Sequence, residues 1–108
     1  MPKKLPALGI GSATRRFLNA SERACEEPCC GAAAYRVTPH RSEAWLRSVG
    51  REAGARALAE INGLLADVAT RADDERFIFL SLQCSAVEIR DWLLRWQEVL
   101  NAAMLRDR

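Results

Sequence analysis

The sequence predicts an α+β protein, a small single domain in which about four helices pack on a two-stranded sheet. Two segments, 52–70 and 85–103, repeat apolar residues at the three-and-four spacing of a helix that buries one face. Two shorter segments, 33–37 and 77–83, contain aromatic and β-branched residues that favour strands. At 108 residues the chain has the size of one domain with one core. We therefore assign residues 12–108 to a single domain.

The N-terminal part is expected to begin with a flexible tail, residues 1–11, whose prolines and glycines leave no apolar period to bury. Ser12 then resembles a helix cap, and apolar residues at helical spacing predict a helix through about residue 26. Pro28 ends that helix, because the residue before a proline is displaced from the helical region. After Gly31, strand-favouring residues predict the first strand at 33–37.

Two helices are predicted in the middle of the chain. Thr38 and Pro39 open the first, since threonine caps helices and proline costs nothing at the first helical position, and Gly50 ends it. Its inner face comprises Trp45, Leu46 and Val49. In the second helix, Gly63 costs about 1 kcal/mol relative to alanine unless a neighbouring backbone approaches it, and we favour such close packing.

The last strand and the last helix are the clearest elements. The strand 77–83 is apolar on both faces, so it is predicted to be central and covered on most sides. Its alternation assigns Phe77 and Phe79 to one face, and to the other face Ile78, Leu80 and Leu82. Ser85-x-x-Glu88 is a capping box that opens the last helix. The apolar stripe of this helix consists of Ile89, Trp92, Leu93, Trp96, Val99, Leu100 and Ala103.

The charge pattern argues against nucleic-acid and membrane partners. The formal net charge is only +2, and the paired cations at 3–4 and 15–16 are separated by apolar and glycine residues. Surfaces that follow phosphates usually gather about six or more cations. No apolar run approaches the roughly 18 residues of a membrane span, and no signal-peptide run is present. We therefore expect a cytoplasmic protein with reduced thiols.

Three of the four cysteines lie within six positions: Cys25, Cys29 and Cys30. With His40 they supply the three sulfurs and one imidazole of a tetrahedral zinc site. Their spacing matches no familiar zinc motif, and free cysteines commonly act as small buried hydrophobes. No cofactor is therefore expected, and zinc is the alternative that this cluster would support.

A thiol-dependent reaction would need a thiolate whose pKa is lowered by a cation or a helix N-terminus. Cys84, just before the capped helix, and Cys30, just before Gly31, are the candidates. His40 is the only histidine, so a Cys–His nucleophilic pair within one chain would include it. No complete catalytic signature accompanies these residues, so the sequence favours a non-catalytic protein and identifies no catalytic residue.

Trp45, Trp92 and Trp96 are candidates for a protein interface or a ligand pocket, because aromatic side chains are enriched at both. Core packing explains these residues equally well, and their helical spacing with leucines favours the core. A pocket between the tryptophan-bearing helix and the sheet would also need a few inward polar groups.

Residues 29–35 have the sequence CCGAAAY, with Glu22 and Cys25 upstream. This segment resembles an uncharacterised bacterial family marked by the motif C-C-G-(I/L)-D-A-(F/Y), in which a short strand and a Pro-initiated helix follow. The chain departs from the motif at Ala32 and Ala33, where the family's acid is missing. The resemblance implies that the turn itself is the shared feature, and it leaves function open.

The leading functional hypothesis is a domain that binds a protein partner or a second copy of itself. An isolated two-stranded sheet is marginal, so either helices cover it or a second chain extends it, and the second alternative gives a homodimer. This hypothesis predicts an exposed apolar patch. The competing hypotheses are a thiol or zinc site formed by the cysteine cluster and His40, and a small-ligand-binding domain with a tryptophan-lined pocket.

Overall fold

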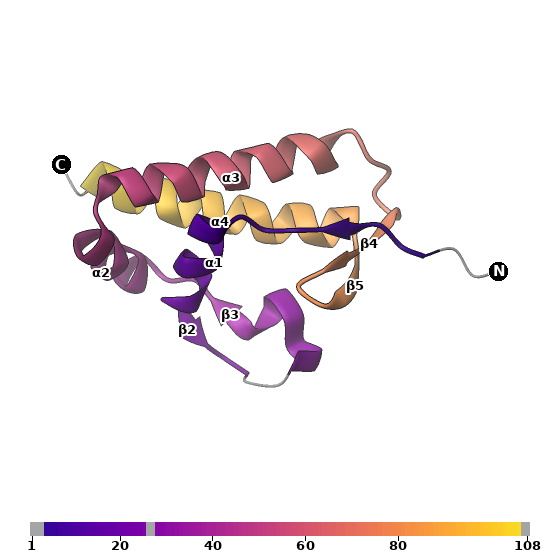
Figure 1. Ribbon diagram of the computed structural model, residues 1–108, viewed down its shortest axis with the longest axis horizontal. Coiled ribbons are helices and arrows are strands. Elements are labelled where there is room, and N and C mark those ends of the chain that lie inside the picture. Colours follow the sequence, from indigo (N-terminus) through magenta and orange to yellow (C-terminus); the bar gives the residue numbers. More distant parts are fainter. Residues whose placement is uncertain (1–3, 26–27, 107–108) are drawn as a thin grey trace.

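The described part of the protein, drawn as a computed structural model in Figure 1, contains four α-helices and two small sheets. The structure describes residues 4–25 and 28–106, except for the side chains of residues 28–30. The helices are α1 (Ser12–Asn19), α2 (Pro39–Val49), α3 (Arg51–Ala69) and α4 (Ala86–Arg106). The predicted α+β class is therefore confirmed.

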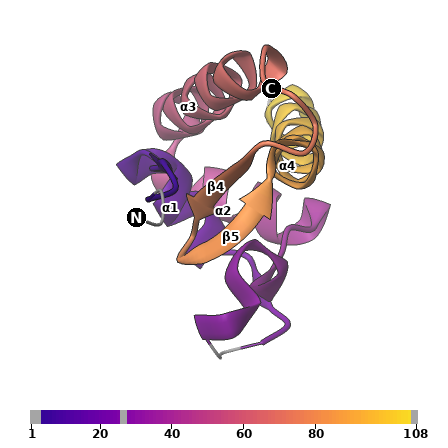
Figure 2. The same ribbon diagram turned by 90° about the vertical axis from the view of Figure 1, so that its right-hand side faces the viewer.

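The two long helices, α3 and α4, lie side by side and form the body of the molecule (Figure 1). Helix α1 packs against α3, and α2 packs against both long helices near the C-terminal end of α4. Figure 2, a view along the long helices, shows the β4–β5 hairpin beneath α3 and α4. The core lies between these layers, where α4 buries Ile89, Leu93, Trp96, Val99, Leu100 and Ala103.

The main sheet has the strand order β1–β4–β5, from Ala7–Leu8, Arg76–Phe79 and Leu82–Ser85. Strand β4 is central, as predicted, but the single strand expected over 77–83 is wrong. Leu80 and Ser81 both have positive φ, 49° and 72°, the combination that closes a two-residue hairpin loop. The chain reverses there, and Leu82 returns directly opposite Phe79 instead of continuing on the face of Ile78.

Part of the expected N-terminal tail belongs to the sheet. Ala7 and Leu8 form β1, which pairs in parallel with Ile78 and Phe79 of β4. The Ile78 N–H donates to the Pro6 carbonyl over 2.9 Å. The chain itself thus supplies a third strand, so the argument for a homodimer from a marginal two-stranded sheet no longer applies.

The segment between α1 and α2 differs most from its prediction. Helix α1 ends at Asn19, and Glu22–Arg23 form β2, which pairs antiparallel with β3 at Tyr35–Arg36. Residues Pro28–Ala34 form the 3-10 segment η1, so the predicted strand 33–37 is reduced to the two residues of β3. Ala24 N–H donates to the Ala34 carbonyl over 2.9 Å, which adds a rung beside this pair.

Helix α2 forms where the sequence predicts it. The Thr38 side chain accepts from the Arg41 N–H over 3.3 Å, Pro39 is the first helical residue, and Gly50 ends the helix with φ of 90°. Trp45 and Leu46 are buried as expected. Val49 was predicted on the same inner face but is 42% exposed, because it lies at the last turn, beyond the packed layer.

The close packing predicted at Gly63 is wrong, since Gly63 is exposed and a Cβ there would meet nothing within 4 Å. The tightly packed glycine of α3 is Gly54, which is buried against the Leu46 side chain. A Cβ at Gly54 would collide with Leu46 Cδ2. This close approach lets α3 lie directly on α2.

Alanine substitutions at these two glycines of α3 are expected to have opposite effects. Gly63→Ala should raise the free energy of unfolding by about 0.5–1 kcal/mol, because alanine has the higher helix propensity. Gly54→Ala should lower it by about 1–2 kcal/mol, because overpacking against the buried Leu46 outweighs that gain. Urea unfolding measures both free-energy changes. Changes of the same sign would contradict the assignment of Gly54 as the packed glycine and Gly63 as the open one.

Candidate functional site

A pocket of about 330 Å³ opens where α1, α2 and α3 meet, and we call it the three-helix pocket. Each helix contributes side chains from consecutive turns, so the pocket follows from ordinary helical spacing. Helix α1 contributes Ser12, Ala13 and Arg16, α2 contributes Trp45 and Val49, and α3 contributes Ala53, Arg56 and Glu60. The lining therefore combines an apolar surface with two cations, one acid and one hydroxyl.

The apolar side of the pocket rests on Trp45. Its ring packs against Phe17 of α1, with ring centroids 5.4 Å apart and planes inclined by 57°. Trp45 is only 7% exposed, so its position is fixed by the core and it offers little surface to the pocket. Val49 lies one turn further along α2 and accounts for the exposed apolar rim.

The two arginines lie on different helices at the polar side of the pocket. Arg16 is exposed on α1, one turn after Ser12. Arg56 is exposed on α3 and pairs with Glu52, one turn earlier, over 3.3 Å. Such an exposed pair contributes little free energy, so Arg56 can exchange Glu52 for another anion at small cost.

Glu60 is the acid of the pocket, and it also holds α1 in place. The backbone N–H of Thr14 donates to Glu60 Oε1 over 2.8 Å, and the Thr14 hydroxyl donates to the same oxygen over 2.7 Å. Thr14 is in the first turn of α1, so this carboxylate satisfies a helix donor that has no partner within the helix. The carboxylate lies against Gly11, where a Cβ would collide with it.

Sequence reasoning missed this anchor. It assigned the cap of α1 to Ser12, whereas Gly11 is the cap residue and makes no side-chain cap bond. The partner of Thr14 lies 46 residues away. The only local signal was the glycine at position 11, which leaves room for a side chain from another element.

The three tryptophans do not meet in one pocket. Trp45 lines the three-helix pocket, whereas Trp92 and Trp96 lie on α4 and face the sheet. Both stack on Phe79, with ring centroids 6.4 Å and 6.1 Å from its ring. Trp96 is buried and Trp92 is half-buried. Two of the candidates thus serve the core, and one contributes to a pocket.

The predicted metal site is described only in part. Cys25 is half-buried and disulfide-bonded, where the sequence predicted reduced thiols, and a disulfide sulfur offers no thiolate to a metal. The side chains of Cys29 and Cys30 lie outside the described residues. His40 is exposed at the second residue of α2. Within the described residues, no three His, Cys, Asp or Glu side chains are grouped to hold a metal ion.

Cys84, the other thiol candidate, is a free cysteine at the end of the core. Burial raises the pKa of the Cys84 thiol, and the neighbouring Glu88 carboxylate adds to the shift. Its Sγ donates weakly to the Leu82 carbonyl over 3.6 Å. Both effects favour the protonated thiol, which is the opposite of what a nucleophilic or metal-binding thiolate requires.

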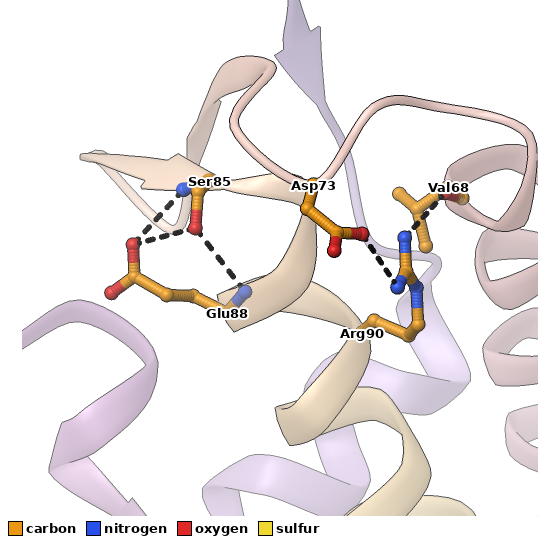
Figure 3. A network of polar contacts seen from close by, with 5 residues as sticks. All are labelled: Val68, Asp73, Ser85, Glu88 and Arg90. Carbon is orange, nitrogen blue, oxygen red and sulfur yellow. Dashed lines mark hydrogen bonds and ion pairs between the residues drawn. The ribbon is translucent and has the colours of Figure 1, made fainter.

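The N-terminus of α4, beside Cys84, is closed by the protein itself (Figure 3). The capping box is confirmed: Glu88 Oε1 accepts from the Ser85 N–H over 3.1 Å, and Ser85 Oγ accepts from the Glu88 N–H over 3.3 Å. Two more N–H groups, of Ala86 and Val87, donate to the carbonyls of Glu75 and Asp73. This helix end therefore has no N–H group left for the Cys84 thiolate or for an external anion.

The last turn of α3 is tied to α4 by Arg90 (Figure 3). Its guanidinium donates to Asp73 Oδ1 over 3.1 Å and to the Val68 carbonyl over 3.4 Å. The Val68 carbonyl, at the C-terminal end of α3, also accepts from the Arg71 N–H over 3.2 Å, so Arg90 adds a further bond to this helix end. Arg90 therefore acts as a structural link between the two helices.

The capping box predicts a pH dependence. The hydrogen bonds from the Ser85 N–H and hydroxyl lower the pKa of Glu88 in the folded protein. Glu88 therefore contributes stability above its unfolded pKa, about 4.3, and that stability is lost as the pH falls through the folded pKa. Glu88→Gln should lose less stability than the wild type between about pH 6 and pH 3. If urea unfolding shows that the free energy of unfolding of both proteins falls equally between these pH values, the prediction is wrong.

Comparison with known proteins gives no family for this chain. No protein-family model matches it, and neither a curated protein nor a solved structure does. In the described part of the chain, no helix is both long and apolar enough to cross a membrane. The function must therefore be argued from the three-helix pocket and the exposed surfaces.

Proposed function

We propose that this chain is a non-catalytic binding domain whose three-helix pocket holds a small organic molecule with an anionic group and an apolar part. The observation that carries the proposal is the pairing of Arg16 and Arg56 with the apolar surface of Trp45 and Val49 in one concavity. Ligand pockets typically combine such an apolar surface with a few polar groups that orient the ligand.

The size and chemistry of the pocket support a small molecule as the ligand. Its volume of about 330 Å³ is near the lower end of the range of about 300–1,000 Å³ for ligand pockets. Arginine binds carboxylate and phosphate through two parallel hydrogen bonds, so an anionic group at Arg16 or Arg56 would be oriented as well as attracted. The lining residues include neither a thiol nor an imidazole, which favours binding over covalent chemistry.

Isothermal titration with 3-phenylpropionate tests the proposal, because this probe has one carboxylate and one aromatic group. Arg16→Gln and Arg56→Gln should each weaken binding by about tenfold or more, as expected for the loss of a charged hydrogen bond. Arg47→Gln is the matched control, because Arg47 is exposed on α2 and does not line the pocket. Absence of binding of both 3-phenylpropionate and L-phenylalanine, or equal loss in all three variants, would overturn the proposal.

A second candidate function is self-association through the outer face of α4. Val87, Leu94 and Leu105 are exposed by 37%, 46% and 57%. Their spacings of 7 and 11 residues place all three on one line of the helix, because 18 residues complete five turns. We name this line the α4 ridge, and we propose that it packs against the same ridge of a second copy of the chain.

Sedimentation velocity over a range of protein concentrations tests self-association. A dimer should form and should be lost in Leu94→Glu, because a charge would be buried at the centre of the ridge. Arg95→Glu is the matched control, since Arg95 is exposed on α4 but lies about 100° around the helix from Leu94, off the ridge. A monomer at all concentrations, or a dimer that survives Leu94→Glu, would exclude this function.

A further inference from the structure

Resting on the proposed binding function, we infer that the ligand of the three-helix pocket is a zwitterion, an α-amino acid with an apolar side chain. The pocket contains charges of both signs: Arg16 and Arg56 face it from α1 and α3, and Glu60 faces it from α3. A ligand with only a carboxylate would satisfy the arginines but would also approach the Glu60 carboxylate. A ligand with both an ammonium and a carboxylate has a partner for each charge.

Glu60 is held in position before any ligand arrives. Its Oε1 accepts both donors of Thr14, over 2.8 Å and 2.7 Å, and its carboxylate is wedged against Gly11. A carboxylate has about four acceptor positions, so Oε2 keeps its capacity to accept from a ligand ammonium. Because the orientation of the carboxylate is already fixed, binding to it loses little conformational entropy.

Charges of opposite sign lie on neighbouring turns of α3 at the pocket. Arg56 and Glu60 are four residues apart, so they are neighbours on one helix face. Arg56 pairs with the exposed Glu52 over 3.3 Å, and exchanging this partner for a ligand carboxylate beside Glu60 would cost little free energy. The apolar side chain of the ligand would then lie against Trp45 and Val49, across the pocket from α3.

Three probes that share a phenyl group separate the contributions of the charges. L-Phenylalanine has both charges, 3-phenylpropionate lacks the ammonium, and phenethylamine lacks the carboxylate. Isothermal titration of the full chain should give the tightest binding to L-phenylalanine, by about tenfold or more over either analogue. Equal affinity for L-phenylalanine and 3-phenylpropionate would overturn the inference while leaving the proposed function intact. Binding of none of the probes would overturn both.

Glu60→Gln tests the role assigned to the acid. The amide oxygen can still accept from Thr14, so α1 should remain anchored, which thermal unfolding checks. The preference for L-phenylalanine over 3-phenylpropionate should fall to about twofold or less, with 3-phenylpropionate still bound. Asp67→Asn is the control, because Asp67 is exposed on α3 and does not line the pocket. An unchanged preference in Glu60→Gln would overturn the inference.

Discussion

Replacing Phe79 with alanine is expected to lower the free energy of unfolding by about 3–5 kcal/mol, the usual cost of truncating a fully buried phenylalanine. Phe79 has no exposed surface, and its ring stacks on both Trp92 and Trp96 of α4. The substitution therefore removes the burial of one ring and two aromatic contacts, each worth about 0.5–1.5 kcal/mol beyond burial. It would also leave a cavity between the sheet and α4.

Urea unfolding followed by tryptophan fluorescence is the measurement, since two of the three tryptophans lie on Phe79. The matched control is Ile78→Ala, one residue earlier in β4 on the opposite face, where the side chain is half-buried. We expect Ile78→Ala to cost less than half as much, because less apolar surface is removed from the core. Equal costs would mean that the packed face of β4 is assigned incorrectly.

The sequence predicted those elements whose determinants are local. The bonds of the α4 capping box span three residues, from Ser85 to Glu88, and the cap of α2 is formed within Thr38–Arg41. The assignment of Phe77 and Phe79 to one face of the strand also depended only on the alternation of neighbouring residues. Each of these signals lies within one turn or one strand, so each was visible without the tertiary structure.

The remaining elements depend on contacts that a linear pattern does not contain. The β4–β5 turn has Leu80 and Ser81 at positive φ, where Asn-Gly is the usual signal, so the sequence pattern indicates one continuous strand instead of a hairpin. Strand β1 has only two residues and exists because β4 offers a free edge. Gly54 differs from Gly63 only in the neighbour that packs on it.

The candidate site shows the same division. Among the predicted site residues whose side chains are described, only Trp45 lines the three-helix pocket, and it was a candidate because aromatic side chains are enriched at ligand sites. The charges that give the pocket its chemistry, Arg16, Arg56 and Glu60, are ordinary surface residues of two helices when considered separately. These side chains line one pocket only because the bonds from Thr14 to Glu60 hold α1 against α3.

Gly31→Ala is the second substitution expected to have a large effect, about 3 kcal/mol of destabilisation. Gly31 has φ of 51° and ψ of −131°, a combination that residues with a Cβ rarely adopt, and such strain costs about 1–3 kcal/mol. A Cβ at this position would also lie 2.7 Å from Leu82 Cδ1, so η1 would have to move away from β5. The glycine of the CCG sequence is therefore required by both backbone and packing.

Gly50→Ala separates the two contributions. Gly50 also has positive φ, 90°, but a Cβ there would meet nothing within 4 Å, so only backbone strain should appear. In urea unfolding, Gly31→Ala should cost about 1 kcal/mol more than Gly50→Ala, the lower end of the usual cost of overpacking. In a protein that already carries Leu82→Ala, Gly31→Ala should cost about 1 kcal/mol less than it does in the wild type, because the truncation removes the atom that the new Cβ would meet. If the double variant shows no such coupling, the contact between η1 and the hairpin does not determine the choice of glycine, and backbone conformation alone does.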